Sequence, residues 1–106
     1  MTVSTHVLDA SLGAPAAGVA VTLSTSAADR WLTVESGLTS ADGRFVFEAG
    51  TPAGAYRLSF ATGAYFAARS VAAFYPEVTI AFTVTEGHFH VPLLLSPFAY
   101  STYRGS

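Results

Sequence analysis

The run Val78–Val84 reads VTIAFTV, in which larger apolar side chains at every second position alternate with threonine or alanine. Successive residues of a β-strand point to opposite faces of a sheet, so this alternation predicts a strand with one buried face. The next run, His88–Ser96 (HFHVPLLLS), repeats the pattern, because its odd positions from 89 to 95 are all apolar. Those positions are predicted to face the core, which leaves His88 and His90 on the opposite face.

Similar strand-like runs recur along the rest of the chain, separated by turn sequences such as Asp42-Gly43. They are Thr5–Leu12, Val19–Ser24, Trp31–Leu38, Arg44–Glu48, Tyr56–Phe60 and Phe98–Arg104. The alanine-rich segment Gly63–Phe74 predicts one helix of about two turns that ends before Pro76. We therefore predict a mainly β fold in which residues 1–106 form a single domain, an antiparallel β-sandwich of about eight strands with one short helix.

Composition narrows the possible partners of this domain. The 106 residues are 51% hydrophobic and only 11% charged, which excludes intrinsic disorder and suggests that part of the surface is covered by another subunit. A net charge of -2 and the absence of lysine argue against nucleic acid and anionic lipid as partners. No apolar run approaches the roughly 18 residues of a membrane span, and Met1–Val7 lacks the features of a secretory signal. We expect a soluble cytoplasmic protein.

The outer face of the predicted sheet gathers titratable and polar side chains. Alternation leaves His6 outside in the first strand, His90 in the run 88–96, and Ser101 and Tyr103 in the last strand. If these strands share a sheet, the four residues converge on a surface that also carries leucines. With Arg44 available after the Asp42-Gly43 turn, two imidazoles on one face suggest an acid–base site for hydrolysis.

Two other interpretations of the histidines remain open. A lone histidine on a strand is usually an ordinary surface residue. His88 and His90, two positions apart on one face with His6 nearby, also match a three-histidine zinc site, because imidazole is the usual zinc ligand. Cysteine is absent, which excludes disulfides, thiolate metal sites and a cysteine nucleophile.

Several motifs make the chain resemble a known family. The turns Gly13-Ala14-Pro15 and Asp42-Gly43 are similar to those of transthyretin-like sandwiches. The segments Phe74–Val78 (FYPEV) and His88–Pro97 (HFHVPLLLSP), together with the terminal Tyr103-Arg104-Gly105-Ser106, resemble the 5-hydroxyisourate hydrolase family. The resemblance covers nearly the whole chain and implies a transthyretin-like fold.

The resemblance also implies an activity, a site and an assembly. The activity is hydrolysis of 5-hydroxyisourate to 2-oxo-4-hydroxy-4-carboxy-5-ureidoimidazoline in urate degradation, without metal or organic cofactor. The family's functional residues correspond to His6, Arg44 and His90, with His88 as a supporting or surface residue. Substrate binding falls to Ser101 and Tyr103 on the last strand and to the tail Arg104, Gly105 and Ser106. The expected assembly is a homotetramer of two dimers, with the sites in the channel between them.

Two functions of other classes share this fold. A transthyretin-type carrier would bind a small aromatic ligand in the same channel, but the channel here is predicted to contain histidines. A non-catalytic prealbumin-like module would need only the turns of the first half of the chain and would be a monomer. The resemblance implies that the terminal Tyr103–Ser106 distinguishes the hydrolase from the carrier. The size in solution separates the expected tetramer from the monomeric module.

Overall fold

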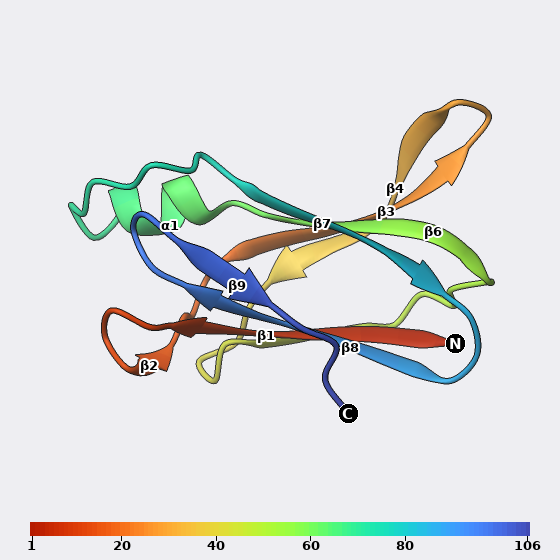
Figure 1. Cartoon of the computed structure of the whole chain (residues 1–106), viewed down its shortest axis with the longest axis horizontal. Helices are drawn as coiled ribbons and strands as arrows, with labels where there is room; N and C mark the ends of the chain where they lie inside the picture. The colour runs from red at the N-terminus through yellow and green to blue at the C-terminus, as the bar shows by residue number, and fades with distance from the viewer.

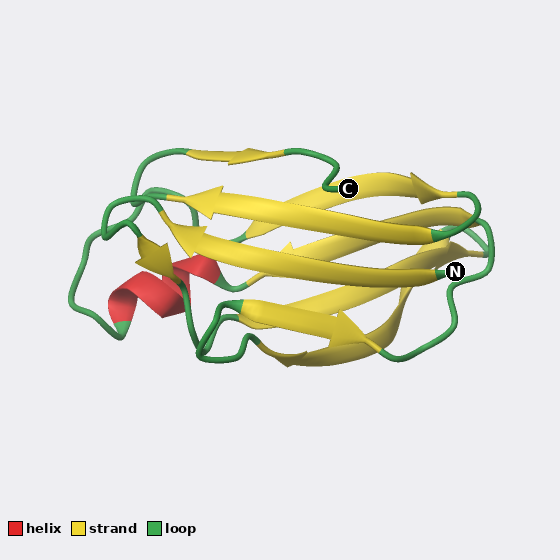
Figure 2. Cartoon of the chain, turned by 90° about the horizontal axis from the view of Figure 1, so that it is seen from below, coloured by secondary structure: helices red, strands yellow, loops and turns green.

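The computed structural model describes all residues from Met1 to Ser106 and contains two β-sheets packed face to face (Figures 1 and 2). The five-stranded sheet consists of β1 (Thr2–Asp9), β2 (Ala14–Pro15), β5 (Arg44–Phe47), β8 (His88–Leu95) and β9 (Tyr100–Thr102). The four-stranded sheet consists of β3 (Ala20–Ala27), β4 (Arg30–Leu38), β6 (Gly54–Phe60) and β7 (Val78–Val84), and helix α1 (Thr62–Ala67) follows β6. The predicted mainly β sandwich with one short helix is confirmed.

The order of strands in the five-stranded sheet puts distant parts of the chain side by side. β1 lies in the middle, with β8 on one side and both β2 and β5 on the other, and β9 forms the edge beyond β8. Figure 2 looks onto this sheet, with the strand that begins at the N-terminus beside the strands of the C-terminal half. All pairs are antiparallel except β1 with β8, which run parallel. The predicted antiparallel sandwich therefore contains one parallel pair that the sequence did not indicate.

The core lies between the sheets and follows the alternation seen in the sequence. Eighteen buried apolar side chains form one cluster, to which every strand except β2, β4 and β9 contributes. In β8, Phe89 and Leu93 are at most 5% exposed, whereas His90 and Leu94 on the other face are partly exposed. The predicted inward face of β8 is confirmed, and its histidines lie on the outer face of the five-stranded sheet.

The first strand begins and ends earlier than the sequence predicts. It starts at Thr2 instead of Thr5, and it stops at Asp9 because the Asp9 carboxylate accepts hydrogen bonds from the backbone N–H groups of Ser11 and Leu12. These bonds turn the chain out of the strand. Leu12, predicted to be the last residue of the strand, therefore lies in a turn and is 65% exposed.

Helix α1 also ends earlier than predicted. Ser70 adopts a left-handed backbone conformation with φ of 57°, the N–H of Val71 donates to the carbonyl of Phe66, and the N–H of Ser70 donates to the carbonyl of Ala67. This pair of bonds is a Schellman motif, which stops a helix whatever follows. The prediction that Pro76 limits the helix is wrong. No helix of the chain has the length and hydropathy needed to cross a membrane.

A buried carboxylate ties α1 to the end of β1. Asp9 is 1% exposed and accepts a hydrogen bond of 2.8 Å from the hydroxyl of Tyr65 on the helix, in addition to those from Ser11 and Leu12. Burial raises the pKa of the Asp9 carboxyl, but these hydrogen bonds outweigh burial and hold the pKa below its usual value. Burial and the neighbouring Asp9 raise the pKa of Tyr65 to about 12.

The variant Asp9→Asn is expected to lose about 2 kcal/mol of stability at pH 7, because a charged acceptor of several hydrogen bonds is removed. A carboxyl whose pKa is lowered on folding stabilises the protein above its unfolded pKa and loses that effect as the pH falls through the folded pKa. Urea unfolding at pH 7 and near pH 3 should therefore show a smaller loss on acidification for the variant than for the wild type. Asp29→Asn, at an exposed hairpin tip, is the matched control and should behave as wild type at both pH values.

Candidate active site

Three strands bring the predicted catalytic residues together on the outer face of the five-stranded sheet. In the register of β1 and β5, His6 lies opposite Arg44, and in that of β1 and β8 it lies opposite Pro92. Ser4, two residues back on β1 and on the same face, lies opposite His90. Neighbouring strands are about 5 Å apart and alternate residues of one strand about 7 Å apart. His6, Arg44 and His90 therefore occupy adjacent positions of one surface.

A hydrogen bond joins the turn before Arg44 to the ring of His6. Gly43 has φ of +76°, and a Cβ at this position would lie only 2.4 Å from the carbonyl oxygen of Val7, so the turn requires glycine. The ring of His6 makes a hydrogen bond of 2.9 Å from Nε2 to the backbone oxygen of Asp42. A carbonyl can only accept, so Nε2 carries the proton, and a neutral His6 has its lone pair on Nδ1.

Ser4 joins the two histidines of β8. Its Oγ lies 2.8 Å from Nδ1 of His90 and 2.8 Å from Nε2 of His88. The other nitrogen of His88, Nδ1, lies 2.6 Å from Oγ1 of Thr2. The two imidazoles are nearly parallel, with an interplanar angle of 18° and ring centroids 6.5 Å apart. One row of side chains thus connects His90 to the exposed start of β1.

The surroundings of His90 disfavour its protonated form. Its partial burial, and then the positive charge of Arg44 and the nearby His88 and His6, lower the pKa of His90 below its ordinary value. Because Nδ1 already contacts Ser4, Nε2 is the nitrogen left for a substrate. A neutral imidazole with a free nitrogen is suited to accept a proton from water, and the nearby guanidinium is suited to bind an anion.

The C-terminal tail closes one side of this surface. The backbone N–H of Gly105 donates a hydrogen bond of 2.8 Å to the carbonyl of His90, and the two residues form an isolated β-bridge. Ser106 then lines a shallow hollow of about 240 Å³ over the sheet. The hollow is bounded by Ser4, Thr5, Arg44, Val46, His88, His90 and Ser106.

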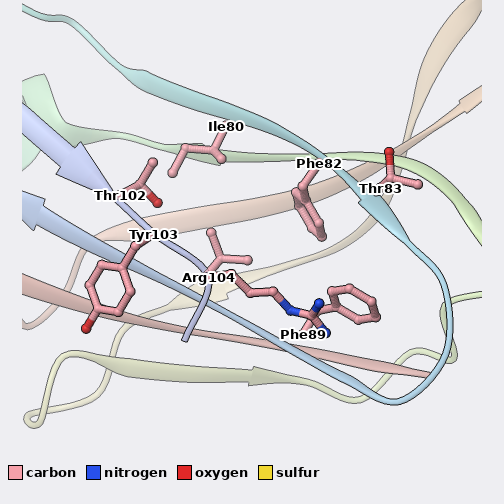
Figure 3. Close-up of a pocket in the computed structure, with 8 residues that line it drawn as sticks. Ile80, Phe82, Thr83, Phe89, Thr102, Tyr103 and Arg104 are labelled. Carbon is pink, nitrogen blue, oxygen red and sulfur yellow. The ribbon is translucent and has the colours of Figure 1, made fainter. Parts of the chain in front are cut away.

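The remaining predicted binding residues lie on different faces of the five-stranded sheet. Ser101 pairs with Leu94 across β8 and β9, and continuing that register toward the His90–Gly105 bridge brings Tyr103 opposite Pro92 on the same outer face. Arg104 is turned the other way, with its guanidinium 4.3 Å from the ring centroid of Phe89 on the core side of β8 (Figure 3). Its side chain is therefore separated from His6, Arg44 and His90 by the sheet.

A second hollow, of about 290 Å³, lies between the free edges of the two sheets. It is lined by Ile80, Phe82 and Thr83 of β7, by Phe89 and Val91 of β8, and by Thr102, Tyr103 and Arg104 of the C-terminal segment. Figure 3 shows the side chains of Ile80 and Phe82 in this hollow, whereas the ring of Tyr103 points away from it. This hollow is mostly apolar and holds none of the histidines.

Sequence reasoning missed Ser4 and Thr2 as members of the site. Both lie on the His6 face of β1, at positions two and four residues before His6. For a strand that starts at Thr2 instead of Thr5, the alternation of period two places both residues on the outer face. The three-histidine zinc site is not formed, because no three His, Asp or Glu side chains are placed so that they could hold one metal ion.

Comparison with known proteins gives a consistent result. Residues 3–105 match the family model described as the HIUase/Transthyretin family. The chain is 43% identical to the 5-hydroxyisourate hydrolase of Salmonella dublin over 97% of this chain and 79% of that one. Among solved structures, the 5-hydroxyisourate hydrolase of Klebsiella pneumoniae is 42% identical, covers all of both chains and superposes with a TM-score of 0.91. Sea bream transthyretin, solved with thyroxine, has the same TM-score at 35% identity and covers 97% of this chain and 93% of that one.

Proposed function

The chain belongs to the HIUase/Transthyretin family, and on that premise we propose that it hydrolyses 5-hydroxyisourate to 2-oxo-4-hydroxy-4-carboxy-5-ureidoimidazoline. The observation that carries the proposal is the position of His90, whose pKa is lowered, beside Arg44 in one hollow, with the C-terminal tail against it. Binding of an apolar ligand by a carrier requires neither a proton acceptor nor a neighbouring guanidinium. The proposed reaction uses neither metal nor organic cofactor.

His90 acts as the general base in this proposal. Its lowered pKa keeps the imidazole unprotonated near neutral pH, and its Nε2 is free because Nδ1 contacts Ser4. Nε2 accepts a proton from a water molecule, and the hydroxide equivalent attacks the ring carbonyl carbon of the substrate. General-base catalysis of this kind contributes about 10²- to 10⁴-fold to a rate.

Arg44 binds the anion and His6 donates a proton in this proposal. The guanidinium of Arg44 holds the anionic substrate and stabilises the negative charge that develops on the carbonyl oxygen. His6 is held by the hydrogen bond from its Nε2 to Asp42, which aims its other nitrogen, Nδ1, for use as a proton donor when the ring is protonated. Nδ1–H then gives its proton to the departing ring nitrogen as the C–N bond breaks.

The tail and the last strand orient the substrate. Ser106 lines the hollow, and Gly105 lies against the ring of His90. Ser101 and the exposed Tyr103 lie on the same outer face, where hydroxyl groups are able to bind the polar edge of the substrate. Arg104 contributes through its stacking on Phe89, which anchors the segment that carries Gly105 and Ser106.

We propose a homotetramer, built as a dimer of dimers, as the active form. The strands β7 and β9 each have one free edge, and the apolar hollow between these edges supports a first subunit contact there. The outer face of the five-stranded sheet carries partly exposed Leu8 and Leu94 and an exposed Val46, which supports a second contact over the active-site surface. Such a contact would turn the shallow hollow into a channel.

The first test is the decay of 5-hydroxyisourate, made freshly from urate with urate oxidase and followed by ultraviolet absorbance. The protein is expected to accelerate the decay by orders of magnitude, with a chelator leaving the rate unchanged, and to elute at about four times its chain mass of 11.0 kDa. A folded tetramer that leaves the spontaneous rate unchanged would contradict the hydrolase proposal, and binding of thyroxine by that tetramer would establish the carrier function.

A further inference from the structure

We propose that Ser4, His88 and Thr2 form a proton relay that accepts the proton of His90 Nδ1 and releases a proton to solvent at the start of β1. The inference rests on the proposed hydrolase function, since it describes how the general base of that reaction is discharged. In this scheme Ser4, His88 and Thr2 are positioning residues, because they act through His90 and need not touch the substrate.

The relay is a continuous row of short contacts across the paired strands β1 and β8. Three contacts join its four members: 2.8 Å from His90 Nδ1 to Ser4 Oγ, 2.8 Å from Ser4 Oγ to His88 Nε2, and 2.6 Å from His88 Nδ1 to Thr2 Oγ1. His90 and Ser4 are at most partly exposed, whereas His88 and Thr2 are exposed. The row therefore runs from the hollow to water.

When both histidines are neutral, two arrangements of this row have all three hydrogen bonds running in the same direction along it. Each hydroxyl has one proton to donate, and each neutral imidazole carries one N–H. In the first arrangement His90 Nδ1–H donates to Ser4, Ser4 donates to His88 Nε2, and His88 Nδ1–H donates to Thr2, so His90 Nε2 has a lone pair. In the second, every bond is reversed and His90 Nε2 carries a proton.

The groups around His90 oppose a positive charge on its ring, and the relay removes that charge. A base that takes a proton at Nε2 and keeps it becomes an imidazolium, and Arg44 from β5, His6 from β1 and His88 from β8 all oppose that charge. In a Ser–His–Asp triad a carboxylate stabilises the imidazolium. The hollow here has no Asp or Glu among its lining residues. Removing the Nδ1 proton leaves His90 neutral throughout and avoids the need for a carboxylate.

The proton balance of the relay is complete. Water gives one proton to His90 Nε2, and its oxygen forms the new bond to the carbonyl carbon. His90 Nδ1 passes its proton to Ser4 Oγ, the hydroxyl proton of Ser4 goes to His88 Nε2, His88 Nδ1 passes its proton to Thr2 Oγ1, and the hydroxyl proton of Thr2 goes to bulk water. The row is then in its second arrangement. After product release, Nε2 loses its proton to solvent and one proton enters at Thr2, which restores the first arrangement.

The variant Ser4→Ala tests the relay, because it removes the atom that both histidines contact. We expect kcat to fall at least about tenfold, which is part of the 10²- to 10⁴-fold that a general base supplies. The distinguishing readout is the proton inventory, the dependence of kcat on the fraction of D₂O. The wild type should give a curved inventory from several protons in flight, and Ser4→Ala a linear one from a single proton.

Three further variants separate a relay from a structural role. Ser4→Thr keeps the hydroxyl and should restore both the rate and the curvature. His88→Phe keeps a flat ring beside His90 but has no nitrogen, and should behave as Ser4→Ala, which covers the case in which Ser4→Ala fails to fold. Ser24→Ala, a half-buried serine on β3 in the other sheet, is the matched control and should behave as wild type.

The result that would overturn the relay differs from the result that would overturn the hydrolase proposal. A linear inventory in the wild type, or a wild-type rate and curvature in folded Ser4→Ala and His88→Phe, would overturn the relay while leaving the hydrolase proposal intact. A wild-type protein that does not accelerate 5-hydroxyisourate decay would overturn the hydrolase proposal itself, before any variant is measured.

Discussion

Replacing His90 with alanine is expected to lower kcat for 5-hydroxyisourate hydrolysis by about 10³-fold or more while leaving the fold intact. The rate should fall because the variant has no proton acceptor at the place where Nε2 now lies, and general-base catalysis supplies about 10²- to 10⁴-fold. The fold should survive because His90 is on the outer face of β8, and the hydrogen bond that it accepts from Gly105 uses the backbone carbonyl. Steady-state kinetics together with thermal unfolding measure both effects.

The pH dependence of the wild type checks the same assignment. A base must be unprotonated to act, so the acid limb of the kcat/KM profile should rise with pH through the pKa of His90. Because burial and the charge of Arg44 lower that pKa, the midpoint of the rise should lie below about 6.5, the ordinary value for histidine. The variant His90→Ala should lose this rise.

A control shows whether the loss is specific to His90. The exposed Glu86, in the turn before β8, is not in contact with the hollow, and Glu86→Ala should keep the wild-type rate. If folded His90→Ala retains the wild-type rate, or if the acid limb of the pH profile is unchanged in that variant, His90 is not the base. His6, the other imidazole of the site, would then be the candidate.

Strand faces could be predicted from the sequence because they depend on local alternation. The inward positions of β8 and β6 follow from a period of two, and their burial matches it. Element ends were predicted less well because they depend on specific hydrogen bonds. Asp9 ends β1 through backbone groups of the next residues, and the left-handed Ser70 ends α1, although serine is not the residue that usually marks such a position.

The site could be predicted only in part, for a related reason. Outer-face positions identified His6 and His90 as candidates, and the turn placed Arg44 near them. Which residues of β1 meet which residues of β8 depends on the register of a parallel pair far apart in sequence. That register brings Ser4 between His88 and His90, so the link between the two histidines could not be found from the spacing of one strand. The direction of the Arg104 side chain, by contrast, follows from alternation, because Tyr103 faces outward and Arg104 then faces Phe89 on the core side of β8.

The glycine in the tail is expected to be as sensitive as a catalytic side chain, although it carries no chemical group. A Cβ at Gly105 would lie 2.5 Å from Cδ2 of His90, and 3.2 and 3.3 Å from the Cγ and Cβ of that residue. The first of these distances is too short for two carbon atoms, so Gly105→Ala must displace either the ring or the tail. Displacement of a reacting group by about 1 Å can cost 10²-fold in rate.

We therefore expect Gly105→Ala to lower kcat by about 10²-fold, with less effect on thermal stability than on rate, because the collision is with a side chain on the outer face. Gly50→Ala is the matched control: Gly50 has no heavy atom within 4 Å of the added Cβ and no positive φ, so its rate should be that of the wild type. If Gly105→Ala is fully active, the ring of His90 tolerates displacement, and the tail does not position the base. If the variant is slow and its pH profile keeps the acid limb with a shifted midpoint, the tail acts on His90 directly, as its contact with the ring requires.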